Sequence, residues 1–502
     1  MTLPSRLLAP VRLLAAFLLC SSLAVSGSAA EPDGSGVLDI GSRLEPLFDT
    51  HLIDRQVNVR LEMHRPVARE VSLVHDEPWE GNTSGYHTVL QDGDTYRMYY
   101  RGHAMDYSGK LKMAHSEVTC YAESKDGIHW TKPKLGLFAW EGSKENNIVW
   151  HGRGNHNFSP FIDTNPACPP EARYKAIGGT HITGLIAFQS ADGIHWSEIR
   201  EEPVFTEGAF DSQNVVFWNE HRGRYDLYFR FFTGKALGAG LRSIGMSSSD
   251  DFLSWNEQRE LDYSGSPPQQ MYTNQVQPYF RAPHVLVAFP TRYVARELTE
   301  HVRQLPPLPL RTKMTDSLKR VGSDLTDVVF MTSRDGLKFN RWDEAFLRPG
   351  PQGQGQWMYG DQYLALGLVE TAPAIEGGPR EVSLYNTENS WRENRRLRRY
   401  SLRTDGFVSV RAPYAGGEFT TRQITFKGRQ LQINYATSAA GSVKVEIQHP
   451  DGRPVRGFSL ADSAEMYGDS INHVVTWQSG SDVSQLAGMP VRVRFVLSDA
   501  DL

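Results

Sequence analysis

The sequence predicts an all-β protein, a five-bladed β-propeller followed by a C-terminal β-sandwich. Three observations support this prediction. A turn related to Ser-x-Asp-Gly recurs five times, short strands rich in Tyr, Phe and Val precede the copies, and the pattern changes after Pro413. Short strands at regular spacing are typical of sandwiches, barrels and propellers. With 502 residues, 40% of them hydrophobic, the chain is long enough for two domains.

The first thirty residues have the order of a secretory signal. Arg6 and Arg12 precede an apolar run over residues 13–25, and Ser28-Ala29-Ala30 precede Glu31. We therefore expect residues 1–30 to be a signal peptide and the protein to be secreted or periplasmic. No later stretch is long and apolar enough to span a membrane. The formal net charge of −5 argues against a nucleic-acid partner.

Two cysteines, Cys120 and Cys168, follow the predicted signal peptide. An exported protein can keep a disulfide, so these two residues could be paired or free. Because the chain has no Cys-x-x-Cys pair, we expect no metal site, and no motif indicates a cofactor.

The recurring turn is clearest in Ser124–Trp130 and Ser190–Trp196, which both read S-x-D-G-I-H-W. Related turns follow at Ser249, Ser333 and Thr404. With the strands ahead of them, these turns indicate a unit of four short antiparallel strands, in which the turn joins the third strand to the fourth. Such a sheet cannot bury both faces alone, so the units are expected to stack around an axis as propeller blades, over residues 31–412.

Strand direction then decides which loops meet at which end of the axis. We call the face at which each innermost strand starts the upper face, and the opposite one the lower face. The recurring turns lie on the lower face, so we interpret His129 and His195 as structural. Active sites of such folds lie at the upper mouth. An insertion, Arg296–Asp324, separates a second strand from a third and therefore falls on the upper face. It could be a partly helical lid or a disordered surface segment.

After Pro413, alternation with a period of two and D-G and K-G turns predict the β-sandwich, residues 418–502. No propeller turn recurs there.

The upper-face loops are rich in carboxylates, amides and aromatic side chains, which suits a polyol ligand. Glycoside hydrolysis needs one carboxylic acid and one carboxylate. Asp211 and Asp361 stand at the starts of inner strands and are our first choices, with Glu80 and Glu388 in support. Each of the four could instead cap loop amides.

Further mouth residues are candidates for substrate binding. Aromatic rings can stack on sugar faces, and amides can pair with hydroxyls. His87 and His156 could hold an ion in the propeller axis, although solvated mouth histidines are commoner. The candidates are Trp79, His87, Asn157, Asn214, Tyr272, Asn274 and Trp357. Three arginines at ends of second strands, Arg101, Arg230 and Arg292, suit an acidic or sulfated glycan. Alternatively, they pair with the site carboxylates and hold them ionised.

The recurring turns, the inner-strand carboxylates and the trailing sandwich resemble the secreted five-bladed propeller glycosidases of glycoside hydrolase families 32 and 43. More specifically, "LFDTHLID" (47–54), "FDSQNVVFW" (210–218) and "YTNQVQPYFRAPH" (272–284) resemble a poorly characterised group of exported bacterial propeller-plus-sandwich proteins. The chain lacks the W-M-N-D-P-N-G, R-D-P and E-C motifs of family 32, so the resemblance implies site residues by position only.

We therefore expect a secreted glycosidase without cofactor whose partner is a carbohydrate substrate. The alternative is a non-catalytic glycan-binding propeller. A sialidase ranks last, because sialidase turns place an extra residue between Asp and Gly and belong to six blades.

Overall fold

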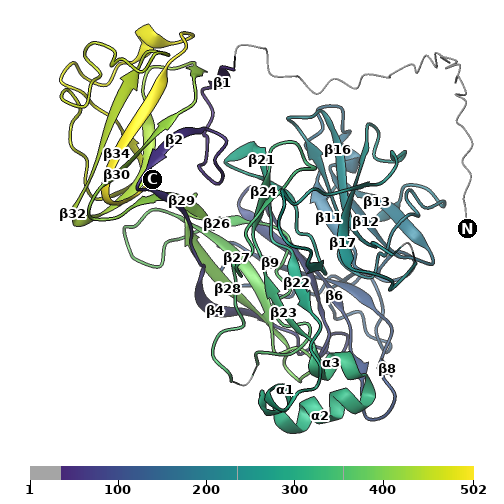
Figure 1. The fold of residues 1–502 in the computed structure, drawn as a ribbon. Coiled ribbons are helices and arrows are strands. Elements are labelled where there is room, and N and C mark those ends of the chain that lie inside the picture. The colour runs from purple at the N-terminus through teal and green to yellow at the C-terminus, as the bar shows by residue number, and fades with distance from the viewer. Residues whose placement is uncertain (1–35, 235, 354) are drawn as a thin grey trace, which may run out of the picture.

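The computed structural model describes residues 36–234, 236–353 and 355–502, so the predicted signal peptide lies outside the described residues. Nearly all regular elements in this part of the chain are strands (Figure 1). Its helical elements are α1 (Glu300–Gln304), α2 (Leu308–Ser317), α3 (Lys319–Ser323) and the 3-10 turns η1 (Pro170–Ala172) and η2 (Ser484–Leu486). The prediction is thus confirmed at the level of a nearly all-β chain.

Five four-stranded antiparallel sheets make up the larger part of the molecule. Sheet 1 has the order β10 (Ile148–Trp150), β9 (Val118–Ser124), β6 (Thr95–Gly102), β5 (Gly85–Asp92). Sheet 2 runs β11 (Ser159–Ile162), β12 (Tyr174–Thr180), β13 (Gly184–Ser190), β14 (Ser197–Glu198). Sheet 3 runs β15 (Val215–Asn219), β16 (Arg224–Phe232), β17 (Arg242–Ser249), β18 (Arg259–Glu260).

Sheets 4 and 5 depart slightly from this pattern. Sheet 4 has the order β20 (Gln277–Tyr279), β21 (Ala282–Ala288), β24 (Met331–Ser333), β25 (Asn340–Arg341). It is prolonged by β19 (Gln270–Met271), β22 (Thr291–Val294) and β23 (Leu325–Val328). Sheet 5 runs β26 (Val369–Thr371), β27 (Glu381–Glu388), β28 (Arg396–Arg403), β4 (Val67–Val74). Its outer strand therefore comes from the N-terminal side of the chain.

Buried clusters join each sheet to the next and the fifth to the first. One pair of residues from each shared cluster shows the order: Tyr121 with Tyr174, Phe161 with Val216, Tyr228 with Met331, Val287 with Val382, and Tyr385 with Met98. The five sheets thus pack in a closed cyclic sequence, which buries both faces of each sheet.

The recurring turn joins the third strand to the fourth in sheets 2, 3 and 4, as predicted. In the turn of sheet 2, Asp192 Oδ1 accepts the backbone N–H groups of Ile194 and His195, each at 2.8 Å. The turn also binds the neighbouring sheet, because Tyr99 Oη donates to the Gly193 carbonyl at 2.9 Å. Equivalent bonds run from Tyr385 to Gly127 and from Tyr228 to Gly336. The repeat is therefore an element of inter-sheet packing.

The C-terminal strands form a second β-rich part (Figure 1). Its sheet runs β2 (Ile53–Val57), β30 (Gly417–Thr421), β34 (Arg492–Asp501), β29 (Val408–Ala412), β3 (Arg60–Met63), and β32 (Gln432–Gln448) pairs with β34 and β33 (Asp469–Val474). Beside it, β1 (Leu38–Gly41) pairs with β31 (Ile424–Phe426). Strands from residues 38–63 thus belong to this C-terminal part, which the predicted domain limits did not include.

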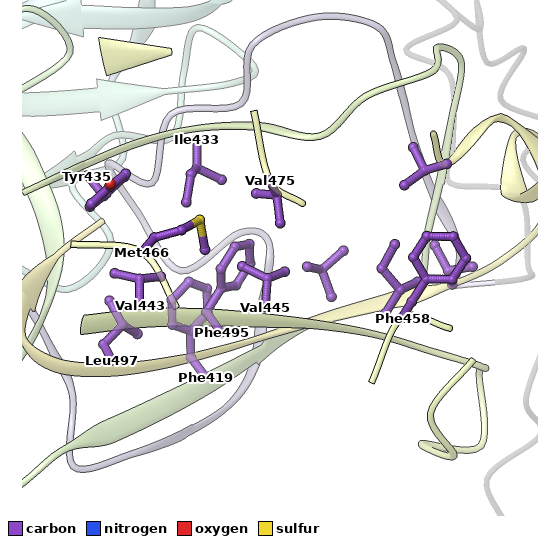
Figure 2. Packing of buried hydrophobic residues seen from close by; sticks show 14 of the residues in the cluster. Phe419, Ile433, Tyr435, Val443, Val445, Phe458, Met466, Val475, Phe495 and Leu497 are labelled. Carbon is purple, nitrogen blue, oxygen red and sulfur yellow. The ribbon is translucent and has the colours of Figure 1, made fainter. Parts of the chain in front are cut away.

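The core of the C-terminal part is aromatic and aliphatic (Figure 2). The rings of Phe419 and Phe495 stack with centroids 4.8 Å apart, and Val443, Val445 and Leu497 are buried beside them. Its buried residues form a cluster of their own, and the partly buried Leu61 packs both against it and against the cluster shared by sheets 4 and 5.

Cys120 is buried in sheet 1, Cys168 is half-buried, and both are free, so the disulfide that we considered is not formed. Among the helices in the described ranges, none has the length and apolar character needed to cross a membrane.

Candidate functional site

Strained backbone marks the loops that lead into the inner strands. Tyr86, Asn157 and Gln275 have φ angles of 54°, 52° and 45°, and each stands at or just before an inner strand, β5, β11 or β20. A non-glycine residue in this region costs about 1–3 kcal/mol, and such residues cluster at functional sites. These loops are therefore candidates for a functional site.

Asp211 is an open carboxylate above buried side chains. Its loop precedes β15 and is fixed by the bond from the Ala209 N–H to the Arg230 carbonyl at 2.7 Å. The Asp211 side chain is 56% exposed, whereas Arg230, whose Nη2 lies 3.5 Å from Oδ2, is only 3% exposed. The Asp211 group is therefore free to meet a ligand while its position is fixed from below.

Positive groups keep this carboxylate ionised. Desolvation pushes the pKa of Asp211 upward, but the nearby imidazole of His156 and the guanidinium groups of Arg230 and Arg101 outweigh it, so the pKa lies well below its usual range. His156 Nε2 is 3.6 Å from Asp211 Oδ1. Asp211 is thus ionised and can attack as a nucleophile, whereas its low pKa makes it a weak base and unsuited to donate a proton.

A second carboxylate, Glu117, lies behind the first. Its Oε2 accepts a hydrogen bond from His156 Nδ1 at 2.7 Å, and its Oε1 is 3.3 Å from Arg101 Nη1. Despite the opposing effect of desolvation, Arg101 and His156 lower the pKa of Glu117 to about 2. Arg101 also donates to Asn157 Oδ1 and the Thr83 carbonyl, each at 3.2 Å. Both Nη atoms of Arg101 are therefore engaged by the protein, while its buried Nε has no hydrogen-bond partner.

Tyrosines form one wall of the site. The guanidinium of Arg230 lies 4.7 Å from the ring centroid of Tyr272, and that of Arg101 lies at the same distance from Tyr86. Tyr359 Oη donates to Tyr272 Oη at 2.7 Å, and the Tyr272 ring stacks on Tyr363. Desolvation and the charge of Asp211 act to raise the pKa of Tyr272. The positive charges of Arg230 and Arg320 and the hydrogen bond from Tyr359 outweigh them, so the pKa of Tyr272 is lowered.

The insertion 296–324 covers this wall. Met314 of α2 and Val321 of α3 share a buried cluster with the tyrosines, and Arg320 Nη1 donates to Tyr359 Oη at 3.3 Å. The fully buried Arg311 donates to the carbonyls of Leu305 and Gly322, at 2.9 and 2.7 Å, and to that of Trp357. The predicted partly helical segment is therefore present and packs beside the site (Figure 1).

Amides connect the inner strands beneath the site. Gln275 Nε2 donates to Gln213 Oε1, and Gln213 Nε2 donates to Thr88 Oγ1, both at 2.7 Å. Beyond them, at the far ends of the inner strands, lies a mostly apolar cavity of about 610 Å³, lined by segments such as 89–91, 160–162 and 215–218. The Asp211 site and this cavity are therefore at opposite ends of the inner strands.

The other three predicted carboxylates are buried in hydrogen-bond networks of their own. Asp361 accepts the backbone N–H groups of Met358 and Ser390, at 2.9 and 2.8 Å, and desolvation raises its pKa. Glu80 pairs with Lys132 at 2.7 Å, and Glu388 pairs with Arg396 and Arg398. These contacts match the loop-capping and structural roles that we left open for them.

The predicted binding residues divide in the same way. Arg101, Arg230 and Tyr272 lie around Asp211, and Asn157 accepts a hydrogen bond from Arg101. The remainder are engaged elsewhere: Arg292 with Asp327, Trp79 with Asn147, His87 with His75, Asn214 with the Phe210 and Ser212 carbonyls, Asn274 with the Gln213 and Tyr228 carbonyls, and Trp357 with the Gly350 carbonyl.

The sequence analysis did not name Glu117, nor the placement of His156 between Glu117 and Asp211. Glu117 directly precedes β9, the third strand of its sheet, and the strand-direction argument would have placed it on the upper face. In the described ranges, no three His, Cys, Asp or Glu side chains are grouped as ligands of a metal.

Comparisons with known proteins give distant likenesses only. No family model matches the chain. An uncharacterized protein of Mycobacterium tuberculosis is 26% identical over 174 residues, which is 32% of this chain. The match covers 49% of that protein, so this chain spans about half the length of the curated relative it matches.

Similar solved structures include glycoside hydrolases and an N-acetylgalactosamine deacetylase. One glycoside hydrolase has a TM-score of 0.41 at 13% identity, covering 68% of this chain and 92% of its own. A glycosyl hydrolase of Bacteroides ovatus has a TM-score of 0.39 at 14% identity, with 70% and 97% covered. An N-acetylgalactosamine deacetylase of F. plautii has a TM-score of 0.39 at 13% identity, with 68% and 94% covered. TM-scores below 0.5 decide neither the fold nor the function of this chain.

Proposed function

We propose that the protein is a secreted or periplasmic glycoside hydrolase, a five-bladed β-propeller with a C-terminal β-sandwich, in which Asp211 is the ionised catalytic carboxylate. The cyclic packing of five four-stranded sheets supports the propeller. The observation that carries the function is the exposed Asp211 side chain, which stands on a floor of buried arginine and tyrosine.

The mechanism follows from the charges in the site. Glycoside hydrolysis needs a carboxylate that attacks the sugar or activates water, and an acid that protonates the leaving oxygen. Because the pKa values of Asp211 and Glu117 are both lowered, neither suits the acid. The proposal therefore assigns the carboxylate role to Asp211 and names no acid within this pair.

The preference for acidic or sulfated glycans stays a prediction. Arg101 faces Glu117, Arg230 faces Asp211, and Arg292 pairs with Asp327, so all three arginines have carboxylate partners. This pairing favours the alternative role, in which they hold carboxylates ionised. Replacing Arg230 with Gln and finding the same preference between neutral and anionic glycans would remove the acidic-substrate idea.

A screen tests the proposal. Purified protein, residues 31–502, is incubated with neutral, uronic and sulfated polysaccharides, and released reducing sugar is measured beside Asp211→Asn. Release that Asp211→Asn abolishes supports a glycosidase. Binding without release would support the alternative, a non-catalytic glycan-binding propeller. The observation that speaks for this alternative is the single open carboxylate in the cluster.

A further inference from the structure

An imidazole stands between two carboxylates in the site. His156 Nδ1 contacts Glu117 Oε2 at 2.7 Å, and His156 Nε2 is 3.6 Å from Asp211 Oδ1. Nε2 is buried and makes no hydrogen bond within 3.5 Å, so the Asp211 carboxylate is the acidic group that it faces. Two carboxylates, one on each ring nitrogen, favour the doubly protonated imidazolium, in which both nitrogens are donors.

The three groups come from different sheets. Glu117 precedes β9 in sheet 1, His156 precedes β11 in sheet 2, and Asp211 precedes β15 in sheet 3. Their side chains are 13%, 17% and 56% exposed, so exposure rises along the line toward Asp211. The outer member therefore meets solvent while the inner two are held within the protein.

Other charged groups face this line from the neighbouring strands. Arg101, at the end of β6, lies against Glu117, and His103 Nε2 is 3.8 Å from Glu117 Oε1. Arg230 of β16 lies against Asp211 on the side away from His156, and Tyr86 and Tyr272 also act on the Asp211 charge. Arg101 opposes protonation of His156, whereas Asp211 and Glu117 favour it.

We propose that His156, anchored by Glu117, is a positioning residue that orients the carboxylate of Asp211 for reaction. This inference rests on the proposed function of Asp211. In the imidazolium form, Nδ1–H donates to Glu117 and Nε2–H points at Oδ1 of Asp211, which leaves Oδ2 beside Arg230. No proton is transferred in this role, and the two contacts hold the carboxylate plane between sheets 2 and 3.

The role has a defined pH dependence. Desolvation lowers the pKa of His156, but its contacts with Asp211 and Glu117 outweigh this, so the pKa is raised above its ordinary value of 6.5. The imidazolium is therefore present below the raised pKa and is lost as the pH rises through it. Neutral imidazole presents a lone pair on Nε2 or Nδ1 and loses one of the two contacts. Activity is then expected to fall on the alkaline side.

The test compares His156→Gln with a matched control, His195→Gln. His195 Nδ1 also contacts an aspartate, Asp192, at 2.7 Å, but this pair is exposed on a recurring turn away from the site. On the glycan that the wild type cleaves, we expect His156→Gln to lower kcat by up to about 100-fold with little change in KM, and to remove the alkaline fall. His195→Gln should behave as the wild type. An unchanged pH profile and kcat in His156→Gln would overturn the proposal.

An NMR titration keeps this inference separate from the question of hydrolysis. The His156 Cε1–H resonance is followed with pH in the wild type, in Glu117→Gln and in Asp211→Asn. Asp211 is exposed, so its substitution should leave the fold intact. If no glycan is cleaved by the wild type, the proposed function fails, and the titration still decides the contact. A fall in the His156 pKa in both variants supports the positioning contact. A His156 titration that is the same in all three proteins would contradict it.

Discussion

The pair of Glu80 and Lys132 allows a sharp test of structural against catalytic carboxylates. The Glu80 side chain is fully buried, that of Lys132 is 14% exposed, and their charged atoms are 2.7 Å apart. Glu80 also accepts from Tyr100 Oη and from the Glu77 N–H, and Lys132 Nζ also donates to the Val74 carbonyl and to Asp76. Replacing Lys132 with Met leaves a buried carboxylate without its cation. Breaking such a pair typically costs about 3–5 kcal/mol of unfolding free energy.

The effect should depend on pH. Desolvation already raises the pKa of Glu80, and removal of Lys132 raises it further. A carboxyl group whose pKa is higher in the folded than in the unfolded state destabilises the fold once the pH rises above the unfolded-state pKa. Lys132→Met should therefore cost more unfolding free energy at pH 8 than at pH 5. Urea unfolding at both pH values measures this cost. Glu80→Gln in the same background should recover part of it.

The control is Lys134→Met, two residues along the chain. Lys134 contacts Glu145 at the same distance, 2.7 Å, but both side chains are about 70% exposed. Its urea midpoint should stay at the wild-type value, because exposed pairs contribute little. If Lys132→Met also leaves the midpoint unchanged at both pH values, the structural role of Glu80 is refuted.

Three further predictions concern other parts of the molecule. Gly193→Ala should lower the urea midpoint more than Gly93→Ala, although both glycines have positive φ. A Cβ at Gly193 would lie 2.6 Å from Tyr99 Oη, whereas a Cβ at Gly93 would have no atom within 4 Å. Equal shifts would speak against the inter-sheet role of the turn. Arg311→Met removes the donors that fix the insertion, so trypsin should cut residues 299–323 faster, while an uncut insertion would contradict this anchoring. Desolvation lowers the pKa of buried His75 to about 3, so stability should fall as the pH drops below 6.5, and His75→Gln should reduce this fall.

The sequence predicted the local repeat better than the long-range closure of the molecule. The turns at Ser124, Ser190, Ser249 and Ser333 carry their own signal, because Ser and Asp specify the turn within a few residues. Three of the four have Gly at the position of positive φ, which Phe252 occupies in the turn at Ser249. The outer strand of sheet 5, β4, comes from residues 67–74, more than 300 positions before its partner β28. No local pattern indicates such a pairing, which depends on the packing of the whole ring.

The site shows the same division. The structure brings Asp211 together with Arg230, Arg101 and Tyr272, at the end of the sheets where strand direction placed them, and their catalytic and binding roles stay predictions. Strand direction could not tell which way a carboxylate turns, and Asp361, at an equivalent inner-strand start, caps the amides of Met358 and Ser390. The orientation of the Asp361 carboxylate depends on the hydrogen bond from the Ser390 N–H, in a loop 29 positions further along the chain. Whether a carboxylate is open or capped therefore needs the three-dimensional structure.

The most direct test of the central claim is hydrolysis by Asp211→Asn and Asp361→Asn, each compared with wild type for released reducing sugar and for the urea midpoint. We expect Asp211→Asn to lower kcat by at least about 100-fold while keeping the wild-type midpoint, because the side chain is exposed and provides the reacting carboxylate. Asp361→Asn should lower the midpoint, because its buried carboxylate holds two loop amides. Full activity in Asp211→Asn would contradict the account, as would a stable Asp361→Asn that alone has lost activity.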